Sequence, residues 1–396
     1  MTPRNKKRVP FIITNIVLTF AAIYLILTIL PPFPLPLSLV NKNAFTQVNA
    51  EYAGRGSLIT LMDGGDNVPA GPAVVREAPF QSSILKSGRA LIIYLPPGYG
   101  SGKARRYPVM YAFHGFASRP QFWVKNLLPA LEDAIVRGDV PPLIVVMPDG
   151  SLSGNGRDDS ATPYDDRGGS WYINSNRGRF EDHFFNEIVP YVEKRFSVLR
   201  GPRNTTLIGT SMGGFAALRY GIARPAFAHI IIPLYAASDL RYSVDGSRTA
   251  AYRADGYRPI TSDMPSRIAN ASLLGGTAGI TDEWLYYPVF DSDAAPGPVW
   301  RENRPVWERM FDVNPVDTLR NGGVTLAGQR YYMLAGIRDD FNFNAHFPVI
   351  LPLLRDAGAK VYPDNPIVLK GRHNWETTVA PRLNDLLLWL GNELKK

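Results

Sequence analysis

The chain has 396 residues, 45% of them hydrophobic and 20% charged, which is the composition of a globular protein with enough length for one large domain. It contains no cysteine, which excludes disulfides, thiolate metal sites and a cysteine nucleophile. The formal charge of +8 includes five basic residues and no acidic residue before residue 50. No basic stripe with interleaved aromatic residues follows, so the charge does not indicate nucleic-acid binding.

The N-terminal segment predicts a membrane anchor. Residues 1–10 form a basic flank, and residues 11–30 form an uncharged apolar run. A helix of that length spans roughly 30 Å, which matches a bilayer core. The basic flank predicts a cytoplasmic N-terminus and an extracytoplasmic remainder. The alternative is a cleaved signal peptide, which would make the protein secreted. The run is longer than a usual signal core, however, and it leads directly into a proline-rich tether at 31–50.

Residues 51–396 have the pattern of one α/β domain. Short antiparallel strands are expected from about 51 to 97, and apolar strands then alternate with helices. Strands are predicted at 108–113, 143–147, 206–208, 230–232, 331–335 and 367–369, and helices at 127–137, 180–196, 215–220, 345–357 and 381–394. This alternation predicts a mostly parallel central sheet with helices on both faces. The segment at about 241–329 interrupts it, and we interpret it as a cap inserted over the active edge of the sheet.

One short motif carries the strongest functional signal. The run Gly209-Thr210-Ser211-Met212-Gly213 follows a predicted strand and precedes a predicted helix. Strand, G-x-S-x-G and helix together are typical of a nucleophile elbow, which lifts a serine hydroxyl off the end of a sheet. Gly209 and Gly213 are needed because a Cβ at either place would clash with a neighbouring strand or helix. Ser211 is therefore the candidate nucleophile.

A serine nucleophile needs a base, and the base needs an orienting acid. The chain has five histidines, and His373 is the one that follows the last predicted strand, where this architecture places the base. The acid is expected in the loop after the preceding strand, where Asp339 and Asp340 are neighbours. We predict Asp339 as the acid and keep Asp340 as the alternative.

The negative oxygen formed during attack needs backbone donors. We expect the N–H of Met212, directly after the nucleophile, and that of Phe116, in the loop after His114-Gly115. Gly115 would allow close approach of the backbone, and His114 is interpreted as structural. Trp171 and Trp375 are possible pocket residues. No phosphate-binding glycine loop and no histidine pair with metal spacing occurs, so we expect no metal and no cofactor.

These motifs, in this order, resemble the esterase D family of the α/β-hydrolase superfamily, which has feruloyl esterase and antigen 85-like branches. The similar segments are 94–99, 107–115, 146–150, 180–182, 208–214 and 371–375. The resemblance implies an α/β-hydrolase fold with Ser211 as nucleophile, His373 as base, Asp339 as acid, and Met212 and Phe116 as oxyanion donors. The chain departs from the family pattern in one respect, because the segment between the nucleophile elbow and the acid is longer than the family usually has.

Together these features predict a membrane-anchored, extracytoplasmic serine esterase that hydrolyses carboxylic esters through an acyl-enzyme. The expected substrate is a small-molecule, carbohydrate or lipid ester. One alternative is an acyltransferase of the mycolyltransferase kind, in which a sugar hydroxyl replaces water. The other is a non-catalytic surface protein on a hydrolase scaffold.

Overall fold

The computed structural model describes residues 74–100, 105–116, 118–152, 169–175, 177–240 and 312–396. The chain divides into two units, 1–55 and 56–396, and all described residues lie in the second. The predicted basic flank, membrane anchor and tether lie outside the described residues, as does the predicted cap up to residue 311. Within the described ranges, no helix combines the length and apolar character needed to cross a bilayer.

An eight-stranded sheet forms the centre of the described residues, in the order β1-β2-β4-β3-β7-β8-β9-β11. The first three strands of this order pair antiparallel, and the strands from β4 to β11 pair parallel. The strands are β1 (Val74–Ser82), β2 (Ser87–Leu95), β4 (Ile144–Pro148), β3 (Val109–Phe113), β7 (Thr205–Thr210), β8 (Ile230–Leu234), β9 (Arg330–Tyr332) and β11 (Lys360–Tyr362). Every residue of the four strands β3, β4, β7 and β8 is buried, as expected for parallel strands covered on both faces.

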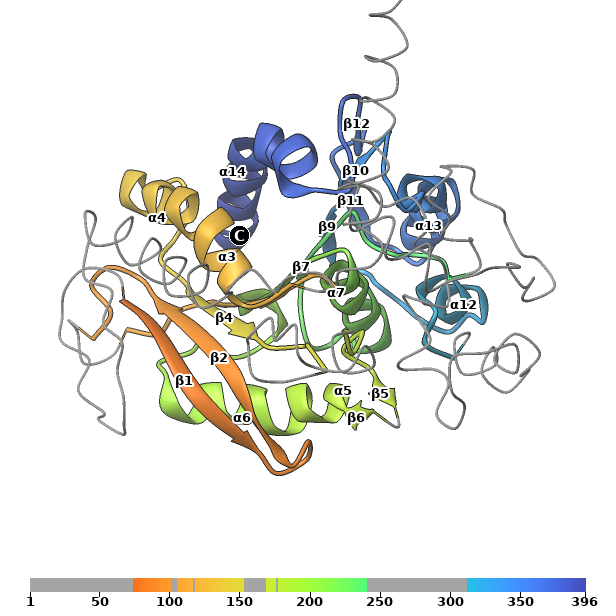
Figure 1. The fold of residues 1–396 in the computed structure, drawn as a ribbon. Coiled ribbons are helices and arrows are strands. Elements are labelled where there is room, and N and C mark those ends of the chain that lie inside the picture. The colour runs from red at the N-terminus through yellow and green to blue at the C-terminus, as the bar shows by residue number, and fades with distance from the viewer. Residues whose placement is uncertain (1–73, 101–104, 117, 153–168, 176, 241–311) are drawn as a thin grey trace, which may run out of the picture. The chain divides into compact units, whose positions relative to one another are not determined.

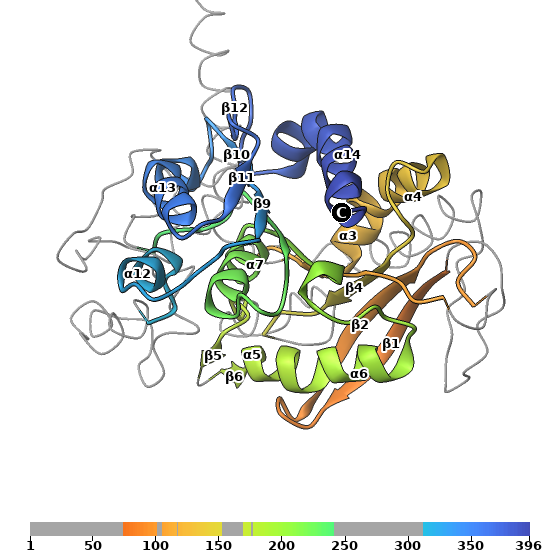
Figure 2. The ribbon, with the colours of Figure 1, turned by 180° about the vertical axis from the view of Figure 1, so that it is seen from behind.

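Helices cover both faces of this sheet (Figures 1 and 2). On one face α4 and α14 pack together beside α3, and on the other lie α5, α6, α7, α12 and α13. Their bounds are α3 (Gln121–Asn126), α4 (Leu128–Arg137), α5 (Phe180–His183), α6 (Val189–Arg195), α7 (Met212–Ala223), α12 (Pro315–Arg320), α13 (Phe347–Asp356) and α14 (Leu383–Leu394). The predicted α/β-hydrolase-like arrangement, a large mostly parallel sheet between two layers of helices, is confirmed.

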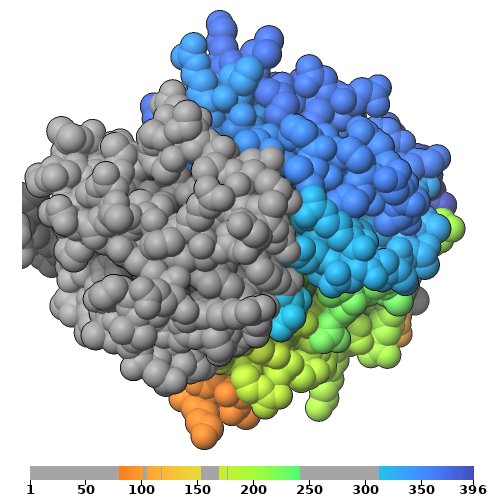
Figure 3. All heavy atoms as spheres, turned by 90° about the vertical axis from the view of Figure 1, so that its right-hand side faces the viewer, coloured from red at the N-terminus to blue at the C-terminus, as the bar shows by residue number. Residues whose placement is uncertain are grey.

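The end of the predicted cap insertion contains regular structure. Its residues 312–329 include α12, which packs against α7 and α13. Figure 3 shows the light-blue segment that begins at residue 312 beside the green segment that holds β7, α7 and β8. Leu326 is completely buried. The α12 helix (Pro315–Arg320), within the predicted insertion, is therefore part of the helical layer of the domain.

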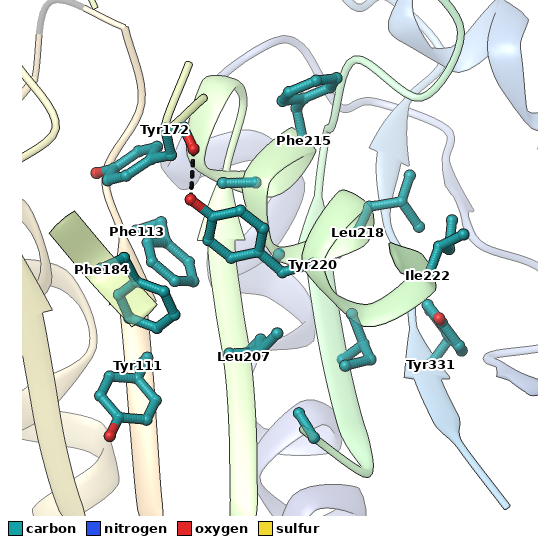
Figure 4. Close-up of a cluster of buried hydrophobic side chains, with 14 of the residues drawn as sticks. Tyr111, Phe113, Tyr172, Phe184, Leu207, Phe215, Leu218, Tyr220, Ile222 and Tyr331 are labelled. Atoms are coloured by element: carbon teal, nitrogen blue, oxygen red, sulfur yellow. Dashed lines mark hydrogen bonds between the residues drawn. The ribbon is translucent and has the colours of Figure 1, made fainter. Parts of the chain in front are cut away.

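An aromatic cluster fills the space between α7 and the central strands (Figure 4). Phe184 stacks on Tyr220 with ring centroids 5.3 Å apart, and Phe113 meets both rings edge-on. The hydroxyl of Tyr220 donates to the carbonyl oxygen of Tyr172, so the buried polar group is satisfied. This packing fixes α7 against β3 and β7, and α7 begins next to the candidate nucleophile.

The long helix predicted at 180–196 contains a π-helical turn. Residues Phe184–Ile188 form this turn between α5 and α6, just before Pro190, whose ring cannot continue regular α-helical hydrogen bonding. Glu187 lies in the turn, and its carboxylate accepts from Ser82 Oγ, His183 Nδ1 and the N–H groups of Ser83 and Ile84. Burial alone would raise the pKa of Glu187, but these hydrogen bonds hold it below its usual value. The carboxylate thereby ties the β1–β2 turn to the helix.

Two predicted strands have a different arrangement from the one expected. The segment predicted as a strand at 331–335 is split, so that β9 joins the main sheet and β10 (Ala335–Gly336) leaves it. The strand predicted at 367–369 is β12 (Ile367–Val368), which pairs with β10 in a separate two-stranded sheet. The edge strand β11 was missed because three residues between Gly358 and Pro363 carry too little pattern.

The remaining described elements are short. They are the β5–β6 pair (Asn174–Ser175 and Gly178–Arg179), the 3-10 turns at Pro202–Asn204, Phe343–His346 and Ala380–Arg382, and a π-helical turn at Trp375–Val379.

Candidate active site

Ser211 lies on a sharp turn between β7 and α7, at the carboxyl end of the central parallel strands. Its φ of 53° and ψ of −116° lie outside the regions that L-residues usually occupy. A Cβ at Gly209 would overlap the Gly213 carbonyl, and a Cβ at Gly213 would overlap the Phe113 carbonyl. Both glycines are therefore required by the close approach of main chain to main chain.

Three side chains distant in the sequence form one hydrogen-bonded chain. His373 Nε2 lies 2.8 Å from Ser211 Oγ, and His373 Nδ1 lies 2.8 Å from Asp339 Oδ2. The other carboxylate oxygen of Asp339 accepts from the N–H groups of Phe341 at 2.9 Å and Phe343 at 3.3 Å. Asp339 is 1% exposed, so water competes little for these bonds. An anion at Nδ1 favours the tautomer in which Nδ1 carries the proton and Nε2 accepts from the serine.

Asp340 occupies a different position from Asp339. Its Oδ1 accepts from the Arg372 guanidinium, with Nη2 at 2.5 Å, and its Oδ2 accepts from the backbone N–H of His373 at 3.3 Å. The hydrogen bond and the charge of Asp340 raise the pKa of Arg372 above its ordinary value. Asp340 thus contacts the loop that carries the imidazole, whereas Asp339 contacts the imidazole itself.

The small β10–β12 sheet brings the acid and the base together. Its parallel pairing places the loop that begins at Gly336 beside the loop that begins at Val368. Arg338 N donates to Gly371 O at 2.9 Å, and a Cβ at Gly336 would overlap the main chain of Gly371. Asp339 directly follows Arg338, and His373 lies two residues after Gly371. The close approach of the two backbones therefore brings the acid and the base within reach of each other.

The base loop is closed by a second set of hydrogen bonds. Arg372 N donates to Thr377 Oγ1 at 2.9 Å, and Thr378 Oγ1 donates to Arg372 O at 2.5 Å. The side chain of Asn374 accepts from Thr377 N and caps the π-helical turn that follows. These bonds on either side of His373 leave its loop little freedom.

A pocket of about 270 Å³ opens beside Ser211 and His373. Half of the fourteen residues that line it are Phe, Trp or Tyr: Phe116, Phe122, Trp171, Tyr235, Phe341, Phe343 and Trp375. Both tryptophans predicted as pocket residues line it. Ser118, Thr210, Asn374 and Glu376 contribute polar groups. A pocket of this size and lining suits a compact apolar group next to the serine hydroxyl.

Aromatic rings also surround the imidazole. The ring centroids of Phe341, Tyr235 and Phe343 lie 4.4, 4.8 and 5.1 Å from that of His373, all edge-on. Burial raises the pKa of Tyr235 despite its hydrogen bond with Thr210, and the nearby Glu376 carboxylate raises it further. Sequence analysis missed these three rings. Phe341 and Phe343 follow Asp339 by two and four residues, which could have suggested them.

Of the two predicted oxyanion donors, Phe116 lines the pocket, and Met212 directly follows Ser211 in the chain. Met212 is the first residue of α7, and the N–H groups of a helix's first turn have no partner within the helix. Gly115 and Phe116 line the pocket together with Ser211. A Cβ at Gly115 would lie 3.4 Å from Ser211 Cβ, an ordinary contact, so space alone does not require glycine there.

The other four histidines are not hydrogen-bonded to the serine. His114 is buried beneath the loop of Gly115, and His183 pairs with Glu187. His229 directly precedes β8, and its backbone N–H donates to the carbonyl oxygens of Pro202 and Thr205. Burial lowers the pKa of His346 to about 3, and its Nδ1 accepts from backbone N–H groups of the loop after β8. Within the described residues, no cluster of three or more His, Cys, Asp or Glu is arranged to hold a metal ion.

Comparison with protein families finds similarity to esterases. The family model described as "Putative esterase" matches residues 82–232. An endo-1,4-beta-xylanase/feruloyl esterase of Xylanibacter ruminicola is 28% identical over 156 residues, which is 38% of this chain and 20% of that protein. An esterase of Mycobacterium tuberculosis is 29% identical over 146 residues, which is 36% of this chain and 27% of that protein. The matches thus span about a fifth to a quarter of the length of these relatives.

Solved structures show the same fold. A ferulic acid esterase superposes with a TM-score of 0.52 at 18% identity, covering 82% of this chain and 99% of that one. An S-formylglutathione hydrolase from Agrobacterium tumefaciens superposes with a TM-score of 0.50 at 15% identity, covering 83% and 98%. The comparisons confirm the resemblance to esterases that the motifs indicated, and the solved structures show that the fold is shared with a ferulic acid esterase and an S-formylglutathione hydrolase.

Proposed function

We propose that this protein is a serine esterase that hydrolyses carboxylic esters through an acyl-enzyme. The observation that carries the proposal is the hydrogen-bonded chain from Ser211 through His373 to Asp339, at the mouth of an aromatic pocket. The match to the esterase family model supports it.

In the proposed reaction, Ser211 Oγ attacks the ester carbonyl carbon while its proton passes to His373 Nε2. The negative carbonyl oxygen accepts hydrogen bonds from the N–H groups of Met212 and Phe116. The C–O bond then breaks, and His373 returns its proton to the departing alkoxide to release the alcohol. A water molecule attacks the acyl-serine by the same route and releases the acid. Asp339 holds the imidazole in orientation and stabilises its charged form.

The pocket supports an acyl group that is small, flat or both, since seven aromatic residues line about 270 Å³. The feruloyl esterase named among the relatives makes aromatic acyl esters a suitable first set of substrates. Short aliphatic esters and acetylated sugars form the comparison set. An added sugar acceptor separates hydrolysis from acyl transfer, because transfer gives a new sugar ester in place of free acid.

The test is the turnover of p-nitrophenyl esters by the protein and by Ser211→Ala. We expect the variant to lose activity by a factor of at least about 10³, since the nucleophile is absent. Ser118→Ala is the matched control, because Ser118 lines the same pocket and is not hydrogen-bonded to His373. Ester turnover that survives Ser211→Ala unchanged would rule out the mechanism, and failure to label with a fluorophosphonate probe would favour a non-catalytic protein.

We further propose that residues 11–30 anchor the protein in the cell membrane with the esterase domain on the extracytoplasmic side. The apolar run of bilayer length behind a basic flank supports this placement. Protease digestion of intact cells tests it, because an extracytoplasmic domain is cleaved without lysis. Release of the domain into the medium, with loss of the first 50 residues, would show instead that the leader is removed.

A further inference from the structure

A buried side chain holds the peptide unit that joins Gly115 to Phe116. His114 Nδ1 lies 2.8 Å from the Gly115 carbonyl oxygen. Because a carbonyl oxygen only accepts, Nδ1 carries the proton in this contact. The carbonyl and the N–H of one trans peptide unit are coplanar and point in opposite directions. A hydrogen bond that fixes the Gly115 carbonyl therefore also fixes the direction of the Phe116 N–H.

The His114 ring is itself firmly held. It is 1% exposed, and its Nε2 lies 2.9 Å from Gly150 N and 3.3 Å from Asp149 Oδ1. A neutral imidazole accepts at Nε2 from Gly150, and a charged one donates at Nε2 to Asp149. Both states keep the proton on Nδ1. Its own backbone N–H donates to the Tyr172 hydroxyl at 3.0 Å.

Asp149 completes this buried support. Burial alone would raise its pKa, but hydrogen bonds with His114 and Ser151 hold the pKa below its usual value. The carboxylate thus remains charged beneath the loop. A charged group at this depth is costly unless it is paired, so Asp149 and His114 restrain each other's position.

From this geometry we infer that His114 is a positioning residue, which aims the Phe116 N–H at the oxyanion by clamping the carbonyl of the same peptide. The carbonyl faces the buried ring, so the N–H faces the opposite side, and Gly115 and Phe116 line the pocket there beside Ser211. The inference rests on the proposed function and adds a component to it. It assigns a task to a histidine that sequence analysis interpreted as structural.

Two amide variants separate the two ring nitrogens. In His114→Asn the side-chain amide occupies the place of Nδ1 and can still donate to the Gly115 carbonyl. In His114→Gln the amide reaches the place of Nε2, beside Asp149 and Gly150. The Gly115 carbonyl then loses its donor from the side chain and keeps only the longer hydrogen bond from Ser118 N, at 3.2 Å. We expect the glutamine variant to lose roughly 10²–10³ in kcat, as when an oxyanion donor is removed, with a much smaller change in KM. We expect the asparagine variant to stay within about tenfold of the parent kcat.

A merely structural role predicts a different pattern. Both variants disturb the same buried site, so a structural role would lower the melting temperature and the activity of both together. Binding of an alkylboronic acid, whose serine adduct is tetrahedral and negatively charged, should weaken in the glutamine variant and persist in the asparagine variant. Equal loss of kcat in both variants, or a glutamine variant within threefold of the parent, overturns the inference.

Failure of the proposed function can be distinguished from failure of this inference. Absence of Ser211-dependent turnover in the parent protein would defeat that proposal, and crystal structures of the two variants would then decide the inference. A Gly115 carbonyl that turns away in the glutamine variant and stays in place in the asparagine variant supports it. A carbonyl that keeps its direction in both refutes it.

Discussion

The two neighbouring aspartates allow a sharp test, which starts from Asp339→Asn. One oxygen of Asp339 accepts two backbone N–H groups, and the other faces His373 Nδ1. An amide in this place keeps its oxygen on the two N–H donors and turns its NH₂ toward Nδ1. Two donors cannot face each other, so the imidazole proton moves to Nε2. The ring then donates to Ser211 Oγ and cannot remove its proton.

We expect Asp339→Asn to lower kcat by about 10³–10⁴, the loss typical of a serine hydrolase whose histidine is held in the wrong tautomer. This corresponds to about 4–5.5 kcal/mol in the activation free energy. The free energy of unfolding should change by no more than about 1–2 kcal/mol, since both backbone hydrogen bonds remain. The measurements are kcat for a p-nitrophenyl ester and urea unfolding of the same preparation.

Asp340→Asn is the matched control. The Arg372 side chain is 47% exposed, and an ion pair with an exposed partner contributes about 0–1 kcal/mol. We expect kcat to fall by less than about tenfold. The reasoning fails if Asp340→Asn proves the more damaging substitution, or if Asp339→Asn retains more than a tenth of the activity.

Three further predictions concern folding, pH and selectivity. Gly213→Ala should yield no soluble folded protein, because its Cβ would overlap a carbonyl of β3. Gly88→Ala, whose Cβ would meet only the end of the Gln81 side chain at 3.1 Å, should fold normally. The measurement is the yield of soluble protein for each variant, with circular dichroism on whatever is soluble. Glu187→Gln should lower the free energy of unfolding by roughly 1–3 kcal/mol at pH 7. Because the pKa of Glu187 is lowered in the folded protein, its stabilisation is present above the unfolded value of about 4.3 and is lost as pH falls below it. The difference in the free energy of unfolding between the two proteins should therefore shrink in urea unfolding at acidic pH; a constant difference would contradict this. Glu376→Gln removes one negative charge from the pocket, which should reduce the repulsion of a substrate that carries a carboxylate. The ratio of kcat/KM for a carboxylate-bearing ester to kcat/KM for a neutral ester should therefore rise by roughly 3- to 10-fold at low salt, and this gain should shrink at high salt.

The fold class and the elbow followed from the sequence alone, because their signals are local. Continuous apolar strands alternating with amphipathic helices leave few arrangements other than a covered parallel sheet. The two glycines around Ser211 report a steric requirement within a few residues of chain, and the structure shows the overlaps that a Cβ would cause. Short strands escaped prediction, because the three residues of β11 cannot display a period.

Only the tertiary structure distinguished Asp339 from Asp340. Adjacent residues of the same type have the same local pattern, and their difference lies in which one reaches an imidazole 34 positions away. That contact depends on β10 and β12, two-residue strands whose pairing lets Gly336 meet Gly371. Likewise, the sequence shows His114 next to a glycine, but only the folded chain brings one ring nitrogen to the Gly115 carbonyl oxygen and the other to the Asp149 carboxylate. Local pattern selects the elements and the residue types, whereas contacts between distant loops, set by backbone packing, decide which atoms meet.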